Sequence, residues 1–227
     1  MDIMPDLMVI AIDGPAAAGK TTIAQLIAER VGFLFFDTGV MYRAVTYAAL
    51  REEIAIEDEA KVTAVAEEIN IDVQSPTQTD GRAYDVLLNG QDVTWEIRSD
   101  AIDQHVSQVS MYRGVRNAMT LKQREIGLRG GVVMVGRDIG TVVLPEADLK
   151  IFLEATVEER ARRRYKERAG RGEAVVLEDI LRSMMARDET DTNRELAPLI
   201  AHQDAVTIDT TTMSINEVVE VILQLIN

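Results

Sequence analysis

The chain contains Gly14-Pro15-Ala16-Ala17-Ala18-Gly19-Lys20-Thr21, which matches the pattern G-x-x-x-x-G-K-S/T of phosphate-binding loops. The two glycines allow the backbone to turn tightly and to point its N–H groups at phosphate oxygens. Lys20 would supply a positive charge for the β and γ phosphates, and Thr21 would supply a hydroxyl ligand for Mg²⁺. The pattern therefore predicts a nucleotide-binding loop.

The segments on both sides of this loop fit the context in which such loops occur. Residues 8–12, MVIAI, form a short apolar run with β-branched residues, as expected of a buried parallel strand. After the loop, apolar residues recur at helical spacing up to Val31. Strand, loop and helix in this order bring a helix N-terminus and its partial positive charge to the phosphates. The alternative, an accidental glycine-rich turn, does not explain both flanks.

Length and composition narrow the possible classes of protein. The chain has 227 residues and 47% hydrophobic content, which suits one sizeable domain with an inserted lobe. It has no cysteine, which excludes disulfides and cysteine-based metal sites. The net charge of −14 disfavours binding to nucleic acid, because its field repels polyanions.

No targeting or membrane signal is recognisable in the sequence. Residues 1–7 carry two aspartates and no basic residue, unlike a signal peptide. No apolar run reaches the length of a membrane span. We therefore expect a cytoplasmic protein without a membrane partner, and the lack of a heptad pattern or long apolar stripe predicts a monomer.

Four further apolar runs, at residues 33–36, 132–135, 149–153 and 205–209, alternate with helical patterns. Together with residues 8–12 they predict a parallel sheet of five strands that is covered by helices on both faces. The pair Asn89-Gly90 between two apolar runs predicts a β-hairpin, so residues 70–95 should form a small antiparallel insert.

Ligands of parallel sheets bind at the carboxyl ends of the strands. The loop at Gly14, Asp37 and Arg137 each follow a predicted strand, so we expect them to converge on one crevice. Arg43 lies near the start of the next helix, which suits a second phosphate. Arg137 lies in a turn bounded by glycines, which indicates close approach to a ligand, although an ion pair with Asp138 is the structural alternative.

Residues 160–194 hold ten basic residues against seven acidic ones. On the predicted helix 157–169, only Glu167 interrupts a face of arginines, and such a face repels itself unless a polyanion meets it. This pattern predicts a lid that closes over phosphates. The face consists of Arg160, Arg163, Arg164 and Arg168.

On the next predicted helix, Arg187, Asp191 and Arg194 fall at i, i+4 and i+7 and share one face. They could bind a sugar or a phosphate, or they could form a ladder of surface salt bridges, and spacing alone leaves both interpretations open. No residue has the features of an essential general base. A monophosphate acceptor is already anionic and needs none, which favours a nucleotide kinase over a kinase of hydroxyl groups.

Four motifs together resemble bacterial-type cytidylate kinases. They are the loop at Gly14–Thr22, DTGVMYR at 37–43, GRDIGTVVLP at 136–145, and RDETDTNR at 187–194. The resemblance runs from about Val9 to the C-terminus. It implies an α/β P-loop NTPase fold in one domain over residues 1–227, with a monophosphate-binding lobe at about 37–130 and a helical lid at about 157–196. It also implies transfer of the γ-phosphoryl group of ATP to CMP or dCMP, giving ADP and CDP or dCDP.

The resemblance also implies roles for individual residues. Catalysis would involve Lys20, Arg137 and Arg187, with Mg²⁺ held through Thr21 and the nucleotide. ATP would contact Gly14, Pro15, Ala16, Ala17, Ala18, Gly19, Lys20, Thr21, Thr22, Arg160 and Arg164. The acceptor nucleotide would contact Thr38, Arg43, Ser107, Arg116, Arg137, Asp138, Arg187, Asp191 and Arg194.

Within this set, the implied readers of cytosine are Ser107, Arg116 and Asp138. Asp138 would accept from the N4 amino group, and Arg116 would donate to the ring acceptors. Uracil carries an oxygen where cytosine carries the amino group, so it would place two acceptors face to face. The sequence departs from the family at Val135, where an acidic residue is usual, and at Thr190 and Thr192, where arginines are common. Asp37 is a further candidate for Mg²⁺, or simply a helix N-cap.

Three rival functions remain to be compared with this one. The nearest is another nucleoside monophosphate kinase, acting on UMP, AMP or dTMP. A regulatory GTPase is disfavoured because the chain has no guanine-reading Asn-Lys-x-Asp motif. A non-catalytic nucleotide-binding module is disfavoured because Lys20, Thr21 and the arginines are all present.

Overall fold

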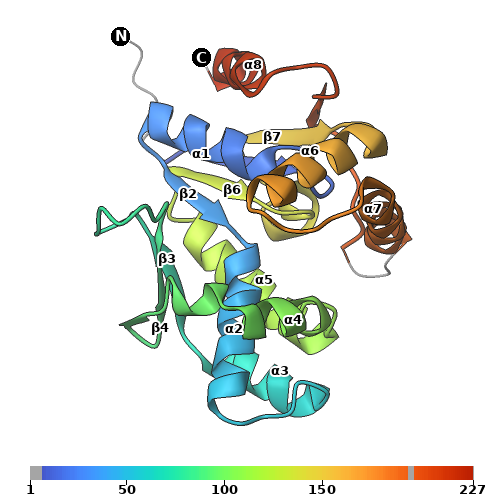
Figure 1. Cartoon of the computed structure of the whole chain (residues 1–227). Coiled ribbons are helices and arrows are strands. Elements are labelled where there is room, and N and C mark those ends of the chain that lie inside the picture. Colours follow the sequence, from blue (N-terminus) through green and yellow to red (C-terminus); the bar gives the residue numbers. More distant parts are fainter. Residues whose placement is uncertain (1–6, 194–196, 227) are drawn as a thin grey trace.

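A computed structural model describes residues 7–193 and 197–226. Its centre is a parallel sheet of five strands in the order β2-β6-β1-β7-β8 (Figure 1). The strands are β1 (Val9–Asp13), β2 (Leu34–Asp37), β6 (Val132–Val135), β7 (Leu149–Glu154) and β8 (Val206–Asp209). The five predicted strands are therefore confirmed, and the central strand β1 is buried along its whole length.

Helices pack against the sheet, as its apolar runs require. The helix after the first loop, α1 (Lys20–Val31), packs with the last helix, α8 (Ile215–Ile226), and Figure 1 shows α5 (Arg113–Gly127) across the sheet from them. The α8 helix begins after Ser214, whose hydroxyl accepts a hydrogen bond from the backbone N–H of Glu217. Within the described ranges, no helix is both long and apolar enough to cross a membrane.

The predicted antiparallel insert is also present. Its strands are β3 (Ile71–Gln74), β4 (Asp85–Leu88) and β5 (Gln91–Asp92). Asn89 and Gly90 connect β4 to β5 with φ values of 50° and 81°. Two consecutive positive φ angles are the geometry that an Asn-Gly hairpin turn requires.

Two groups of helices lie on either side of the loop that follows β1 (Figure 1). On one side, α6 (Val157–Gly170) packs on α7 (Leu177–Asn193) around Ala161, Ile180 and Met184. The other side holds α2 (Gly39–Arg51), α3 (Glu59–Glu68), the short helix η1 (Glu96–Arg98), α4 (Asp100–Val109) and α5. The division into a lobe at 37–130 and a lid at 157–196 stays a prediction, and residues 194–196 fall outside the described residues.

Candidate active site

The loop between β1 and α1 has the conformation that its glycines allow. Gly14 has a φ of 146°, and a Cβ atom at this position would lie 2.0 Å from the carbonyl oxygen of Leu153. Gly19 has a φ of 95° and directly precedes α1, which begins at Lys20. Strand, loop and helix therefore follow one another as the sequence predicts, with the first N–H groups of α1 turned toward the loop.

The Lys20 side chain folds back over its own loop. Its Nζ atom donates hydrogen bonds to the carbonyl oxygens of Gly14 at 2.7 Å and Pro15 at 2.6 Å. The pKa of Lys20 is lowered to about 7, mainly by burial and also by the positive charges of Arg137 and Arg187, while Asp37 and Asp13 oppose the shift. This ammonium group would be stabilised by an added anion.

Asp37 performs two tasks at the end of β2. One carboxylate oxygen accepts the backbone N–H of Gly39 at 3.0 Å at the start of α2, and the other accepts the Thr21 hydroxyl at 3.3 Å. The interpretation of Asp37 as the N-cap is wrong, because Thr38 occupies that position and Asp37 accepts the Gly39 N–H from one residue before it. Its role toward Mg²⁺ stays a prediction. Two hard oxygen atoms lie together beside the phosphate-binding loop, which is the kind of ligand that Mg²⁺ prefers. The described residues contain no group of three or more typical metal-ligand side chains.

The turn after β6 brings Arg137 and Asp138 into contact with two different helices. Arg137 pairs with Asp191 of α7 at 2.9 Å, and Asp138 pairs with Arg116 of α5 at 2.7 Å. All four side chains are largely buried. The alternative of an ion pair between Arg137 and Asp138 is thus not what the structure shows, and residues of three distant segments meet at this turn.

The remaining predicted acceptor residues lie on α2 and α4. The Thr38 hydroxyl donates to the carbonyl oxygen of Val135 at 2.9 Å. Arg43 pairs with Asp103 of α4 at 2.6 Å and donates to the carbonyl oxygen of Ile97 at 3.2 Å. Ser107 is exposed on α4 and is bonded through its backbone carbonyl to the Ser110 hydroxyl.

The arginines of α6 differ from their prediction. Arg160 is only 5% exposed and forms a two-pronged ion pair with Asp188 of α7, at 3.2 and 2.6 Å. It also donates to the carbonyl oxygen of Ala16 at 3.3 Å, so it stabilises the backbone of the phosphate-binding loop. The expected face of uncompensated arginines is wrong, because acids pair with the others as well. These pairs are Arg163–Glu159, Arg164–Glu167 and Arg168–Glu173.

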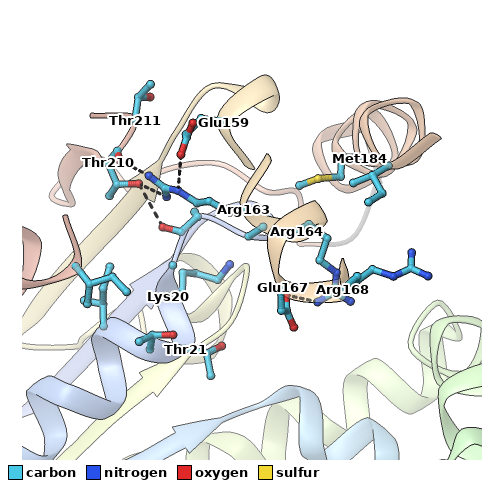
Figure 2. A pocket seen from close by; sticks show the side chains of 18 of the residues that line it. Lys20, Thr21, Glu159, Arg163, Arg164, Glu167, Arg168, Met184, Thr210 and Thr211 are labelled. Atoms are coloured by element: carbon cyan, nitrogen blue, oxygen red, sulfur yellow. Dashed lines mark hydrogen bonds and ion pairs between the residues drawn. The ribbon is translucent and has the colours of Figure 1, made fainter. Parts of the chain in front are cut away.

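A cleft of about 1290 Å³ opens between the phosphate-binding loop, α6, α7 and the segment after β8. Figure 2 shows Lys20 and Thr21 on its floor, Arg163 directed toward Thr210, and Arg164 and Arg168 further along α6. Arg163 and Arg168, which the sequence analysis placed on the face of the lid, line the cleft, and so do Thr210–Ser214, which it did not assign to the site. The rule that ligands bind beyond strand ends could have indicated Thr210–Ser214, since they follow β8 directly.

Comparison with known proteins agrees with this geometry. The family model described as Cytidylate kinase matches residues 10–227. The chain belongs to the cytidylate kinase family. Curated cytidylate kinases of Geobacillus sp. and Bacillus subtilis are both 48% identical to it, covering 96% and 95% of this chain and 96% and 94% of their own length.

The fold is shared with a wider set of kinases. The crystal structure of shikimate kinase from Bacteroides thetaiotaomicron is similar to this chain with a TM-score of 0.50 at 12% sequence identity, over 96% of this chain and 98% of that one. This likeness concerns the P-loop kinase fold alone. The family match, which rests on sequence, also covers the motifs at 37–43 and 136–145.

Two positions at which this cytidylate kinase family member departs from the usual family residues can now be placed. Val135 is buried at the end of β6, in register with Asp37 of β2, so an acid there would lie beside Asp37. The Thr190 hydroxyl donates to the carbonyl oxygen of Ala186 within α7. The acidic side chain nearest to Thr21 is therefore supplied by β2 and not by β6.

Asp13 is a buried residue of the site that the sequence analysis missed. It ends β1 and is 5% exposed, and its carboxylate accepts the backbone N–H groups of Ile139 at 2.9 Å and Gly140 at 2.7 Å. The pKa of Asp13 is raised to about 6, mainly by burial and to a smaller extent by the charge of Asp138, whereas the two hydrogen bonds and Lys20 oppose the shift. Its position at a strand end, one residue before Gly14, is the signal that could have identified it.

The raised pKa of Asp13 predicts a pH dependence of stability. The pKa of Asp13 is higher in the folded protein than its ordinary value of 3.8. Its contribution to the free energy of unfolding is therefore fully present below pH 3.8 and is lost as pH rises through about 6. Asp13→Asn removes this titration. As pH rises from about 4 to about 7, we expect the free energy of unfolding of the wild type to fall by up to about 3 kcal/mol relative to that of the variant. Urea unfolding at each pH measures this difference, and a constant difference would contradict the prediction.

Proposed function

We propose that the cleft and the adjoining turn at Arg137 form the site where ATP phosphorylates CMP or dCMP. As a member of the cytidylate kinase family, the chain is an ATP-dependent (d)CMP kinase that yields ADP and CDP or dCDP. The observation that carries the assignment of the site is the contact of Asp13, which directly precedes the phosphate-binding loop, with the turn that follows Arg137 and the Arg116–Asp138 pair.

Three positive groups surround the expected position of the transferred phosphoryl group. Arg137 and Arg187 both lie close enough to Lys20 to lower its pKa. Phosphoryl transfer spreads negative charge over the equatorial oxygens of the moving group, so clustered cations stabilise the transition state more than the ground state. We assign Lys20, Arg137 and Arg187 to this role, and residues 14–22 to the donor phosphates.

On the acceptor side, we assign the monophosphate to Thr38, Arg43 and Arg137. Arg187 and Asp191 would contact the ribose and phosphate, and the same role for Arg194 rests on the sequence alone, because Arg194 lies outside the described residues. The acceptor oxygen is already anionic, so no general base is required. Arg43 and Arg137 are now paired with Asp103 and Asp191, and a phosphate would compete with these carboxylates.

We assign recognition of cytosine to Asp138 and Arg116, with Ser107 on α4. Their mutual ion pair of 2.7 Å shows that an acceptor and a donor lie side by side in a largely buried place. Cytosine would present its amino donor to the Asp138 carboxylate and its ring acceptors to Arg116, whereas uracil carries an acceptor in place of the amino group. Discrimination against uracil would follow from leaving buried polar groups without partners.

Mg²⁺ is the divalent ion that we propose for the reaction, with the Thr21 hydroxyl and the Asp37 carboxylate as its protein contacts. Their separation of 3.3 Å supports this choice, because two oxygen atoms so close together could contact the same ion. The ion would neutralise charge on the β and γ phosphates. A cytoplasmic location and a monomeric state remain predictions from the sequence, as do the contacts of Arg160 and Arg164 with ATP.

The acceptor preference tests the function directly. We expect ADP release with ATP and Mg²⁺ to be fast with CMP and dCMP, and slower by about a hundredfold or more with UMP, AMP and dTMP, because these bases do not match Asp138 and Arg116. Equal use of UMP or AMP would retain the kinase but reject the base assignment. A lack of turnover with every acceptor would instead indicate a nucleotide-binding module.

The role of Lys20 is tested by Lys20→Ala. We expect kcat to fall by about a hundredfold or more, because a charge at the transferred group is removed. The nucleotide-free variant should remain as stable as the wild type, since the lost ammonium group is poorly solvated. Lys122→Ala is the matched control, since Lys122 of α5 donates an exposed hydrogen bond to the carbonyl oxygen of Glu67 of α3. Wild-type activity in Lys20→Ala would overturn the mechanism.

Asp37→Asn tests the proposed metal contact. We expect the Mg²⁺ concentration for half-maximal velocity to rise about tenfold, because an amide is a weaker partner for the ion than a carboxylate. Asp58→Asn, which alters a carboxylate that caps α3, serves as the control. A Mg²⁺ requirement that is unchanged in Asp37→Asn would leave Asp37 with its bond to the Gly39 N–H alone.

A further inference from the structure

The turn that follows the proposed base reader Asp138 is capped in an unusual way. Residues Ile139–Val143 form one short helical turn of the π type, and Asp138 occupies its N-cap position. The first N–H groups of a helical turn lack partners within it, and an aspartate at the N-cap normally accepts one of them through its side chain. The Asp138 side chain makes no such capping bond.

Asp13 performs this task from a distant part of the chain. Its Oδ1 atom accepts the N–H of Ile139 at 2.9 Å and its Oδ2 atom accepts the N–H of Gly140 at 2.7 Å. A Cβ atom on Gly140 would lie 3.4 Å from Asp13 Oδ2, so the turn approaches this carboxylate closely. Both oxygen atoms of Asp13 are therefore engaged, and one of them accepts the N–H of Gly140, the second residue of the turn, which an N-cap side chain would otherwise accept.

Asp138 is directed elsewhere as a result. Its Oδ2 atom accepts a hydrogen bond from Arg116 of α5 at 2.7 Å, and each of these side chains is 12% exposed. Asp13 and Asp138 are close enough to repel one another electrostatically. A carboxylate at Asp13 thus occupies the N–H groups of the turn and disfavours a second carboxylate there.

We propose that Asp13 is a positioning residue for base specificity, which caps the turn in place of Asp138 and thereby keeps the Asp138 carboxylate beside Arg116, where it reads cytosine. This inference rests on the proposed role of Asp138 as a reader of the base. It also gives β1 a second function, because the strand that carries the phosphate-binding loop then sets the acceptor preference.

Asp13→Asn is the first test. Asparagine keeps one acceptor oxygen but turns an NH₂ group toward the second N–H, which leaves that N–H for Asp138 to cap. We expect the ratio of kcat/KM for CMP to kcat/KM for UMP to fall about tenfold, with little change in KM for ATP. An unchanged ratio would overturn the proposal.

A double-mutant cycle separates positioning from a general loss of structure. If Asp13 acts through Asp138, then Asp13→Asn should not lower the CMP to UMP ratio further in an Asp138→Asn background. An equal additional fall in that background would overturn the proposal. Asp138→Asn alone tests the proposed function: if that variant kept the wild-type ratio, the base assignment itself would fail, whereas failure of Asp13→Asn alone rejects only the present inference.

Asp148→Asn provides the matched control. Asp148 also accepts a backbone N–H through its carboxylate, from Val9 at 2.8 Å, but at the opposite end of β1. The CMP to UMP ratio should be that of the wild type in this variant. A fall as large as that of Asp13→Asn would overturn the proposal, since any weakened contact of β1 would then have the same effect.

A measurement on the wild-type protein covers the case in which Asp13→Asn does not fold. NMR scalar couplings across hydrogen bonds identify which carboxyl carbon is bonded to a given amide nitrogen. We expect the amides of Ile139 and Gly140 to couple to the Asp13 carboxyl carbon in the nucleotide-free protein. Coupling to the Asp138 carboxyl carbon instead would show that Asp138 caps its own turn and would overturn the proposal.

Discussion

The parallel pairing of β1 with β6 is the constraint on which the site depends. Ile12 lies opposite Val135, so the two chains leave the sheet at the same level, one into the phosphate-binding loop and the other into the turn with Arg137 and Asp138. Parallel strands align their carboxyl ends at one edge of the sheet. The register of the strands therefore brings the proposed sites for the phosphoryl donor and the phosphoryl acceptor together. The two hydrogen bonds from the turn to Asp13 stabilise this arrangement.

The charged side chains of the site are arranged to bind ligands of the opposite charge. Burial raises the pKa of Asp13 and lowers that of Lys20, which means that both charged forms are disfavoured in the nucleotide-free protein. Carbonyl oxygens hold Lys20, and carboxylates hold Arg137 and Arg43. The proposed phosphates would compete with these protein partners for the cations. Sites with such arrangements commonly reduce stability in favour of function.

Local patterns predicted the parts of the structure that local physics determines. The flanks of the loop, the five apolar strands and the Asn89-Gly90 hairpin were all recognisable, because each depends on neighbouring residues. The ion pair of Arg160 was not, since inspection of one helix face could not reveal that Asp188 of the next helix would pair with it. Asp13 was missed for the same reason, as its partners lie 126 and 127 residues away. The pairs Arg163–Glu159 and Arg164–Glu167 lie within α6, and their spacing could have indicated them.

The burial of Arg160 restricts the substitutions that the fold tolerates at this position and at Asp188. The flat guanidinium group of Arg160 contacts three acceptor groups in different directions, namely the carbonyl oxygens of Ala155 and Ala16 and the Asp188 carboxylate. Lysine concentrates its donors at one point and could not reach all of them. Loss of the Asp188 charge alone would leave the buried Arg160 guanidinium group without its carboxylate partner. We therefore expect Arg160 and Asp188 to change together in related sequences, because a tolerated substitution at one position requires a compensating substitution at the other.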